Sequence, residues 1–292
     1  MSTSTPSASQ VVESAAEMQQ QALAWRRAGD EVGFVPTMGA LHAGHDSLVE
    51  RAKRENRRVV ASIFVNPKQF APGEDFHRYP RPFEADRARL AALGVDAIFH
   101  PPVEQIYPPA FRTAIDPGPL GAVLEGASRP GHFTGVLTVV LKLFELTVPT
   151  RAYCGQKDFQ QVVLIRQLVR DFSLPVRVVA CPTVRDSDGL AMSSRNAYLS
   201  AEHRAAAPVI RRALGEAVSA FIRGVSDPDQ LELAARAVIS QAPGVQIDYV
   251  SVLEEVTLGR PKLAQAGNVL AVAVKLGATR LIDNTVLGAE RF

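Results

Sequence analysis

Cysteine is scarce in this sequence, which contains Cys154 and Cys181 among 292 residues. Both stand in apolar runs typical of strands, without partners at metal-site spacing. Reduced core thiols are therefore favoured over a disulfide framework. Net charge is also small, because 32 Lys and Arg oppose 30 Asp and Glu and leave +2. This balance excludes the broad basic surface of a nucleic-acid-binding protein.

Long apolar runs are missing as well. The longest candidate for a membrane span, GVLTVVLKLFELTV, is interrupted by Lys142 and Glu145. The opening MSTSTPSASQ has neither the apolar core of a signal peptide nor the arginines of a transit peptide. We therefore expect a disordered tail over residues 1–10 and a cytoplasmic protein.

The composition that remains is globular, with 47% hydrophobic and 21% charged residues over a length typical of two domains. β-branched runs alternate with helical patterns in the first two thirds. This alternation predicts an α/β fold with a doubly wound, Rossmann-like parallel sheet. The predicted strands are Val32–Pro36, Val59–Val65, Ala97–His100, Arg151–Cys154 and Val176–Cys181. The predicted helices are His45–Asn56, Phe83–Leu93, Thr134–Val148 and Phe159–Phe172.

The pattern changes after residue 184. Helices and then successive strands predict a smaller α+β domain with an antiparallel sheet. We therefore expect a domain of residues 1–184 and a C-terminal domain of residues 185–292. The expected elements are helices near Ala201–Gly224 and Asp227–Gln241, and strands at Gln246–Leu253, Val269–Leu276 and Thr279–Asp283.

The stretch VPTMGALHAGHD follows the first predicted strand and leads into a helix. Gly39 and Gly44 allow the backbone to come close to a ligand, while His42 and His45 share one helix face. Unpaired N–H groups and the helix dipole favour an anion at such a position. The stretch indicates a phosphate-binding loop, although a tight turn or a metal site stays open.

Two other polar segments lie at strand ends or in loops. SIFVNPKQF ends an apolar strand with Asn66 and Gln69, and LEGASRPGHFTGV carries Arg129 and His132 in a glycine-rich loop. Each segment alone is also explained by an ordinary turn and solvated side chains. Both PTMGALHAGH and NPKQF follow predicted strands and would lie on the ligand-binding edge of a doubly wound sheet.

A third polar segment, YCGQKDFQQ, again runs from a strand through a glycine into a helix. Lys157 is a suitable phosphate-binding charge, and Asp158 could cap the helix. Gln161, one helical turn further, would point back toward the strand edge. An isolated lysine is otherwise usually solvated.

The segment RDSDGLAMSSRNAYLS offers several hydrogen-bond donors to a polyphosphate through Ser193, Ser194 and Arg195. Together with the first loop, it resembles the paired HIGH and KMSKS signatures of the class I synthetase and nucleotidyltransferase superfamily. Here these would be HAGH (42–45) and MSSR (192–195). Members of that superfamily attack the α-phosphorus of ATP and release pyrophosphate.

Five motifs in order make the resemblance more specific. PTMGALHAGH, SIFVNPKQF, RPGHFTGVLTVVLKLF, GQKDFQQ and DGLAMSSRNAYL cover about residues 30–204. The chain thereby resembles the pantothenate synthetase family, also called pantoate–β-alanine ligases. The resemblance implies ATP-dependent condensation of pantoate with β-alanine through pantoyl adenylate, with release of AMP and pyrophosphate. It also implies a homodimer.

The resemblance assigns roles to individual residues. Gln69 and Gln161 would bind pantoate, and Asn66, Arg129 and His132 are candidates for further contacts. The implied catalytic residues are His42, His45, Lys157, Ser193, Ser194 and Arg195. The implied ATP-binding residues are Met38, Gly39, Ala40, Leu41, His42, Ala43, Gly44, His45, Gly155, Gln156, Lys157, Asp158, Val184, Met192, Ser193, Ser194 and Arg195.

Magnesium is the expected companion of ATP in this family, held in part by acidic residues after a YPR segment. This chain reads RYPRPFEADRARL there, so Glu84 and Asp86 are separated by Ala85. The candidate ligand is therefore Glu84 or Asp86, with waters and substrate phosphates completing the shell. Zinc at the two histidines is disfavoured, since no cysteine or third histidine accompanies them.

Three other functions compete with the ligase. Another adenylyltransferase of the superfamily, acting on a phosphorylated substrate, would need a second basic site, whereas the amides Gln69 and Gln161 suit a hydroxy acid. A non-catalytic nucleotide sensor would not need both histidines, Lys157 and the serine pair. A tRNA-binding synthetase is disfavoured by the charge balance and by the lack of an anticodon-sized appendage.

Overall fold

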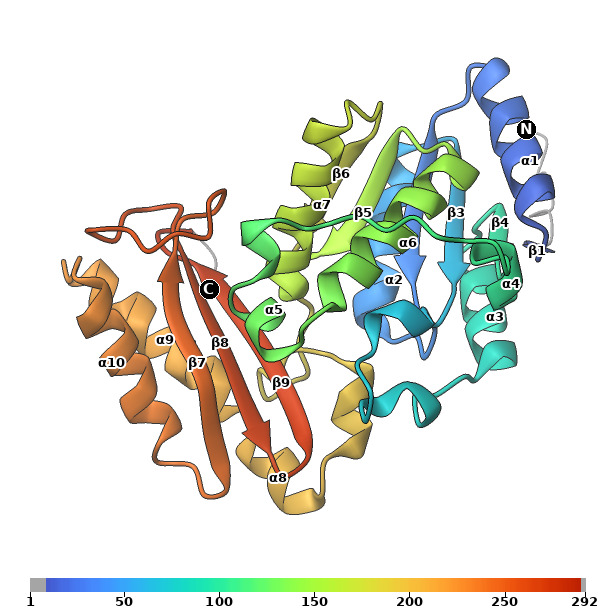
Figure 1. Ribbon diagram of the computed structural model, residues 1–292. Helices are drawn as coiled ribbons and strands as arrows, with labels where there is room; N and C mark the ends of the chain where they lie inside the picture. Colours follow the sequence, from blue (N-terminus) through green and yellow to red (C-terminus); the bar gives the residue numbers. More distant parts are fainter. Residues whose placement is uncertain (1–8, 290–292) are drawn as a thin grey trace, which may run out of the picture. The chain divides into compact units, whose positions relative to one another are not determined.

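The computed structural model describes residues 9–289 (Figure 1). The chain forms two compact units, Met1–Gly155 with Leu164–Cys181, and Gln156–Val163 with Pro182–Phe292. No helix within residues 9–289 is both long and apolar enough to cross a membrane.

The first unit contains a six-stranded, all-parallel sheet in the order β1-β4-β3-β2-β5-β6 (Figure 1). Its strands are β1 Gln10–Val12, β2 Val32–Thr37, β3 Arg58–Ile63, β4 Ala97–Phe99, β5 Arg151–Gly155 and β6 Arg177–Cys181. The strand order reverses between β2 and β5. Ligands of open α/β sheets bind outside the carboxyl ends of the strands at such a switch point. The predicted doubly wound parallel sheet is confirmed.

Helices cover both faces of this sheet. The α-helices are α1 Ala15–Arg27, α2 Ala43–Glu55, α3 Phe83–Ala92, α4 Val103–Ile106, α5 Glu125–Ser128, α6 His132–Thr147 and α7 Phe159–Asp171. The short 3₁₀ helices of this unit are η1 Pro67–Gln69, η2 Asp75–His77 and η3 Pro119–Gly121, whereas η4 Gln156–Asp158, directly before α7, belongs to the second unit. On one face, Leu48 and Val49 of α2 and Leu90 of α3 belong to one buried apolar cluster with the strands. On the other, Phe34 of β2 meets Phe144 of α6 edge to face, with ring centroids 6.2 Å apart.

The amino-terminal region differs from the prediction. Residues 9 and 10 of the predicted tail are part of the fold, because Gln10 begins β1 and the Ser9 hydroxyl donates to the Val95 carbonyl at 2.6 Å. Residues 1–8 of that tail lie outside the described residues. Helix α1 also follows, which the sequence patterns do not predict. Its buried side chains are Met18 and Ala22, too few for a clear apolar stripe.

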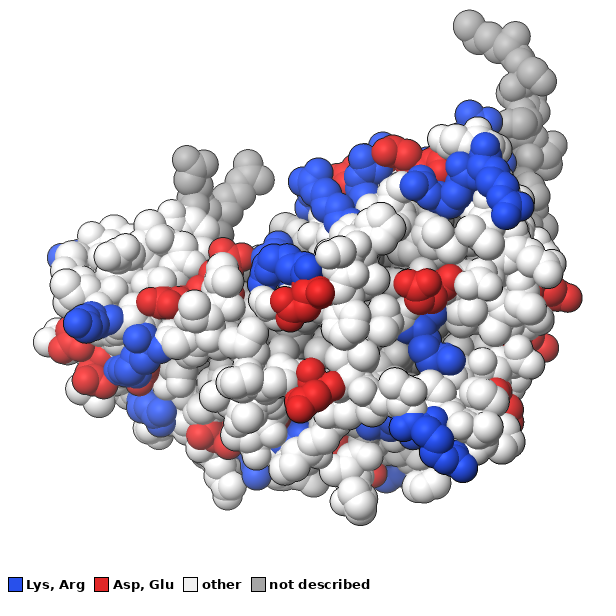
Figure 2. All heavy atoms as spheres, turned by 45° about the horizontal axis from the view of Figure 1, so that its top comes forward, with Lys and Arg blue, Asp and Glu red and all other residues white. Residues whose placement is uncertain are grey.

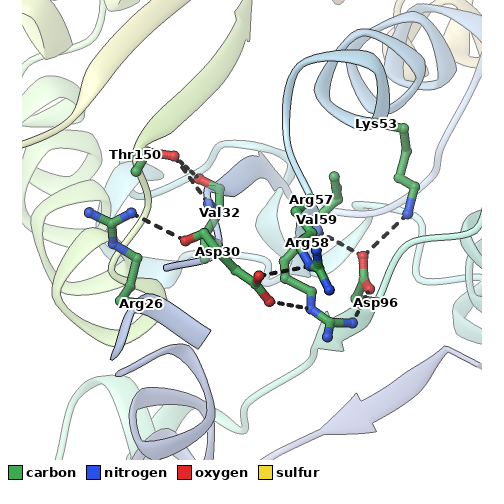
Figure 3. Close-up of polar contacts among 9 residues, drawn as sticks. All are labelled: Arg26, Asp30, Val32, Lys53, Arg57, Arg58, Val59, Asp96 and Thr150. Carbon is green, nitrogen blue, oxygen red and sulfur yellow. Dashed lines mark hydrogen bonds and ion pairs between the residues drawn. The ribbon is translucent and has the colours of Figure 1, made fainter. Parts of the chain in front are cut away.

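Ion pairs close the amino ends of the sheet (Figure 3). Asp30, before β2, pairs with Arg57 at 2.8 Å and with Arg58 at 3.0 Å. Asp96, before β4, pairs with Arg58 at 3.1 Å and with Lys53 at 3.3 Å. The hydrogen bonds that Arg58 donates to both carboxylates raise its pKa. This network lies at the end of the sheet opposite to the loops that carry the candidate site residues.

The surface carries mixed charge. In the view of Figure 2, Lys and Arg side chains gather along the upper edge with Asp and Glu side chains among them. The near balance of the whole sequence is thus reproduced locally on this face. Such a surface gives little long-range attraction for a polyanion.

The second unit contains the antiparallel sheet β7-β8-β9, as predicted. Its elements are η5 Ser194–Tyr198, α8 Ala201–Ala206, α9 Val209–Ile222, α10 Pro228–Ile239, β7 Val245–Leu253, β8 Val269–Leu276 and β9 Thr279–Val286. The helix predicted over 201–224 is divided at Pro208, which lacks the N–H that a continuous helix requires. Buried side chains of α9 and α10 pack on the sheet as one core.

The second unit also includes Gln156–Val163, a segment that the predicted domain boundary places in the first domain. Helix α7 therefore begins in the second unit and continues in the first. The boundary after residue 184 stays a prediction.

Candidate functional site

Two histidines cap helix α2 at the carboxyl end of β2. We call residues 38–45 the histidine loop. Nδ1 of His42 accepts the N–H of Gly44 at 3.1 Å, and Nδ1 of His45 accepts the N–H of His42 at 3.2 Å. The pair forms a capping box in which imidazoles take the places of the usual Ser and Glu. Because each Nδ1 accepts, a neutral ring at either position carries its proton on Nε2.

The middle of the histidine loop is held by α3. The two carboxylate oxygens of Asp86 accept the N–H groups of Ala40 at 2.7 Å and of Leu41 at 2.8 Å. The other candidate magnesium ligand, Glu84, is exposed and pairs with Arg87 at 2.7 Å. Among residues 9–289, no three His, Cys, Asp or Glu side chains are grouped to hold a metal ion. The donors present do not fit a magnesium site built by the protein alone.

The turn after β3 is built around Asn66, which is 1% exposed. We call residues 66–70 the Gln69 turn. Asn66 Nδ2 donates to Gln69 Oε1 at 3.0 Å and to the Gly135 carbonyl at 3.1 Å, while its Oδ1 accepts from the Tyr107 hydroxyl at 2.8 Å. Burial raises the pKa of Tyr107, so the phenol stays protonated as a donor. Gln69 Nε2 approaches Met38 Sδ at 3.2 Å. Asn66 therefore orients the Gln69 amide.

Arg129 and His132 hold the backbone of the same turn. Arg129 forms two hydrogen bonds with Glu74, at 2.8 and 2.7 Å, and a third with the Gln69 carbonyl at 3.3 Å. Burial and the Arg129 charge lower the pKa of His132 to about 4, so its ring is neutral near pH 7. Nδ1 of His132 can then donate to the Gln69 carbonyl at 2.8 Å, while Nε2 accepts from Arg129 at 3.1 Å. Both side chains support Gln69.

A cavity beside these loops has a volume of about 330 Å³ and is mainly apolar. Among its polar residues, Arg81 donates to the Tyr79 and Phe76 carbonyls, and His100 bonds the Ile63 carbonyl. The lining includes Met38, Gly39, Phe64, Phe83, Asp86 and His100. Neither predicted pantoate amide lines it, so the cavity adds no support to their assignment.

In the second unit, Asn284 of β9 fixes the turn that carries Lys157. Its Nδ2 donates to the carbonyls of Gln156 at 2.9 Å and of Lys157 at 3.0 Å. The Lys157 ammonium lies 3.5 Å from a carboxylate oxygen of Asp158. Asn284 and its neighbour Asp283 are buried polar residues in β9, whose sequence TRLIDNTV mixes polar and apolar residues. The mixed composition of this strand gives no sequence signal that singles them out.

Asp283 anchors the serine-containing loop. Arg185 forms two bonds with its carboxylate, at 2.6 and 3.1 Å, and the Met192 N–H reaches the Val184 carbonyl at 3.0 Å. The Ser193 hydroxyl accepts the N–H of Arg195 at 3.3 Å and begins η5. The loop is thus an ordered turn tied to β9.

The candidate residues therefore fall into one group in each unit. The first unit brings together Met38, Gly39, Ala40, Leu41, His42, Ala43, Gly44, His45, Asn66, Gln69, Arg129 and His132 through the contacts above, and it also contains Gly155 at the end of β5. The second unit contains Gln156, Lys157, Asp158, Gln161, Val184, Met192, Ser193, Ser194 and Arg195. Sequence patterns missed the supporting side chains Glu74, Tyr107, Asp283 and Asn284, and the role of Asp86.

Comparison with known proteins decides the family. The family model described as pantoate-beta-alanine ligase matches residues 10–286. The chain belongs to this family. The pantothenate synthetase of Herpetosiphon aurantiacus is 52% identical over 269 residues, covering 92% of this chain and 98% of that protein. The Agrobacterium fabrum pantothenate synthetase is 50% identical over 282 residues, covering 96% and 97%.

Solved structures agree with this assignment. The crystal structure of pantothenate synthetase from Thermus thermophilus matches with a TM-score of 0.90 and 49% identity, covering 95% of this chain and 99% of that one. The Francisella tularensis pantoate-beta-alanine ligase, complexed with beta-gamma ATP and β-alanine, matches with a TM-score of 0.78 and 36% identity, covering 97% and 99%. The predicted fold, family and ligase activity are confirmed: the chain is an enzyme that joins pantoate to β-alanine.

Proposed function

We propose that this ligase activates pantoate with ATP, forms pantoyl adenylate, and releases AMP and pyrophosphate. The observation that carries the proposal is the imidazole capping box, in which Nδ1 of His42 and Nδ1 of His45 each accept a backbone N–H at the N-terminus of α2. The Francisella tularensis relative, complexed with beta-gamma ATP and β-alanine, supports both as substrates here. The predicted ATP site therefore becomes part of the proposal.

In the first step, a carboxylate oxygen of pantoate attacks the α-phosphorus of ATP. The bond from that phosphorus to the bridging oxygen breaks, and pyrophosphate leaves. His42 and His45 donate hydrogen bonds to the departing pyrophosphate. The phosphates are bound by Lys157, Ser193, Ser194 and Arg195. Within its own unit, each loop is held by the contacts described above, and groups oriented before the reaction stabilise the transition state without costly rearrangement.

In the second step, the β-alanine amine attacks the carbonyl carbon of the mixed anhydride. The bond between that carbon and the phosphate oxygen breaks, AMP leaves, and the amine gives up a proton to form pantothenate. Gln69 and Gln161 bind the hydroxyls and carboxylate of pantoate. Asn66, Arg129 and His132 support Gln69 through the contacts described above.

Magnesium is proposed as the ion that accompanies ATP, where it would neutralise phosphate charge. Glu84 and Asp86 have other partners, and no step above passes through a metal held by the protein. A homodimer, which the family resemblance implies, and a cytoplasmic location, which the sequence patterns predict, stay proposals.

Exchange of labelled pyrophosphate into ATP tests the adenylate intermediate. With pantoate present and β-alanine omitted, exchange should proceed, because the first step is reversible and complete without the amine. Omission of pantoate should abolish it. Exchange that strictly requires β-alanine, or formation of ADP in place of AMP, would contradict the proposal.

A further inference from the structure

Asp86 lies on α3 but contacts the backbone of the histidine loop, which comes much earlier in the chain. Oδ2 accepts the Ala40 N–H at 2.7 Å, and Oδ1 accepts the Leu41 N–H at 2.8 Å. The residue is 3% exposed. Bonds from backbone N–H groups to an ionised carboxylate are among the stronger hydrogen bonds in proteins. Asp86 thus fixes the two residues that precede His42.

The loop needs such support because of its backbone conformation. Gly39 has φ +83° and Ala40 has φ +52°, so two successive residues adopt the left-handed region. This region is unfavourable for alanine, and it persists where surrounding contacts stabilise it. The carboxylate of Asp86 supplies that contact by accepting the N–H of Ala40 itself.

Gly39 also makes room for the carboxylate. A Cβ at this position would lie 2.9 Å from Asp86 Oδ2 and 3.1 Å from Ile63 Cγ2. The glycine of the motif therefore serves a contact within the protein, whereas the sequence indicated only an approach to phosphate. The lack of a side chain at Gly39 therefore allows the buried Asp86 carboxylate to reach the backbone of the loop.

A second residue of α3 holds the other side of the loop. Arg89, one turn after Asp86, forms two hydrogen bonds of 2.6 Å with the carboxylate of Asp46 in the first turn of α2. One of its guanidinium nitrogens also lies 3.5 Å from the Leu41 carbonyl. Helix α3 consequently contacts the chain before His42 and after His45. The positions of both imidazoles depend on this attachment.

We propose that Asp86 is a positioning residue that holds the histidine loop in the conformation required for ATP, and that it is not a magnesium ligand. This inference rests on the proposed function. A metal role does not agree with the surroundings of Asp86. Both of its oxygens already bind N–H groups, and the neighbouring acid Glu84 is directed to Arg87.

The test compares Asp86→Asn with the matched control Glu84→Gln on the same helix. The single carbonyl oxygen of an asparagine can accept only one of the N–H groups of Ala40 and Leu41. Its NH₂ group would face the other N–H, so that two donors oppose each other. Pyrophosphate exchange in Asp86→Asn should fall about 10-fold to 100-fold, the size of loss that small misplacements of reacting groups cause. Glu84→Gln should stay within about twofold of wild type, since Arg87 and Glu84 form an exposed pair.

Magnesium titration at fixed ATP separates positioning from metal binding. The free Mg²⁺ concentration for half-maximal exchange should be the same in Asp86→Asn and wild type. A rightward shift of about tenfold, with the rate restored by excess Mg²⁺, would make Asp86 a metal ligand and overturn the proposal. A rate in Asp86→Asn within twofold of wild type would overturn it too.

Amide hydrogen exchange of the ligand-free protein gives a readout that is independent of activity. The Ala40 and Leu41 amide protons should be protected in wild type and Glu84→Gln and exposed in Asp86→Asn. Adding Ala40→Gly to Asp86→Asn should recover part of the rate of pyrophosphate exchange into ATP, because glycine tolerates φ +52° without support. Unprotected amides in wild type would contradict the proposal even if the adenylate chemistry is correct. If the two amide protons are protected in wild type but pantoate does not bring about pyrophosphate exchange, the proposed function is refuted and the positioning role of Asp86 is not.

Discussion

The two turns that follow β2 and β3 are both held in a fixed conformation, but by different kinds of contact. The histidine loop is fixed from outside by an ionised carboxylate and presents donors at a helix N-terminus. The Gln69 turn is fixed by close packing against α6, by the Arg129 guanidinium and by neutral groups, including an uncharged His132. The first arrangement suits a polyphosphate whose charge moves during reaction. The second suits the hydroxyls of a small acid, so we expect the loops to affect rate and affinity respectively.

The largest expected change on the Gln69 side comes from Gly135→Ala. A Cβ at Gly135 would lie 2.1 Å from the Lys68 carbonyl oxygen and 2.6 Å from the Gln69 nitrogen, both backbone atoms. The turn must move, so kcat/KM for pantoate should fall about 100-fold, with a loss of about 1–3 kcal/mol in unfolding free energy. Steady-state kinetics and urea denaturation measure both effects. Glu145→Ala, an exposed change on the same helix, is the control, and equal kinetics in the two variants would show that the packing is irrelevant.

A smaller and more selective change is Gln69→Glu. The new carboxylate still accepts from Asn66 but loses the Nε2–H donors and repels the carboxylate of pantoate. Pantoate affinity should weaken about 10-fold to 100-fold, the range for losing a hydrogen bond to a charged group. Calorimetric titration with pantoate and with an ATP analogue checks this. Loss of ATP binding with pantoate binding kept would reverse the roles of the two loops.

The neutral state of His132 makes a prediction about pH. Its pKa of about 4 in the folded protein lies below the ordinary value of 6.5, so the unfolded chain binds more protons between these values. Stability should therefore be lost as pH falls below 6.5, by about 1 kcal/mol between pH 7 and 5.5 from this residue. Urea denaturation at several pH values should show that the unfolding free energy falls more steeply with decreasing pH in wild type than in His132→Gln. Parallel pH profiles would mean that His132 is not held neutral.

The smallest effect is expected at the opposite end of the sheet. Arg57 pairs with Asp30, but its side chain is 74% exposed. Arg57→Ala should change unfolding free energy by less than about 1 kcal/mol, as exposed ion pairs generally contribute little. Kinetic constants for pantoate and ATP should equal those of wild type. A kinetic defect there would show that the distinction between the two ends of the sheet is wrong.

Local patterns predicted the sheet and the histidine loop because their signals lie within short stretches. β2 and β3 are mostly apolar, and His42 and His45 stand three residues apart beside glycines. β1 has three residues and α1 buries few side chains, so neither gave a sufficient pattern.

Supporting residues could not be predicted because their meaning depends on distant contacts. Asp86 meets Ala40 across 46 positions, and Asn284 meets Gln156 across 128. In sequence, Asp86 is an ordinary acid in the first turn of a helix, where helix dipoles favour it anyway. The roles assigned to substrate-contacting residues stay predictions, whereas their supporting contacts are part of the fold.

Single-turnover formation of pantoyl adenylate by His45→Ala tests the central claim most directly, with ATP varied at saturating pantoate. Loss of one oriented donor should reduce the maximal rate about 10²–10³-fold, while the ATP concentration for half-maximal rate changes much less. Circular dichroism should show an intact fold. A maximal rate within a few-fold of wild type, or a defect that excess ATP removes, would contradict the assignment of the histidine loop to the rate of adenylate formation.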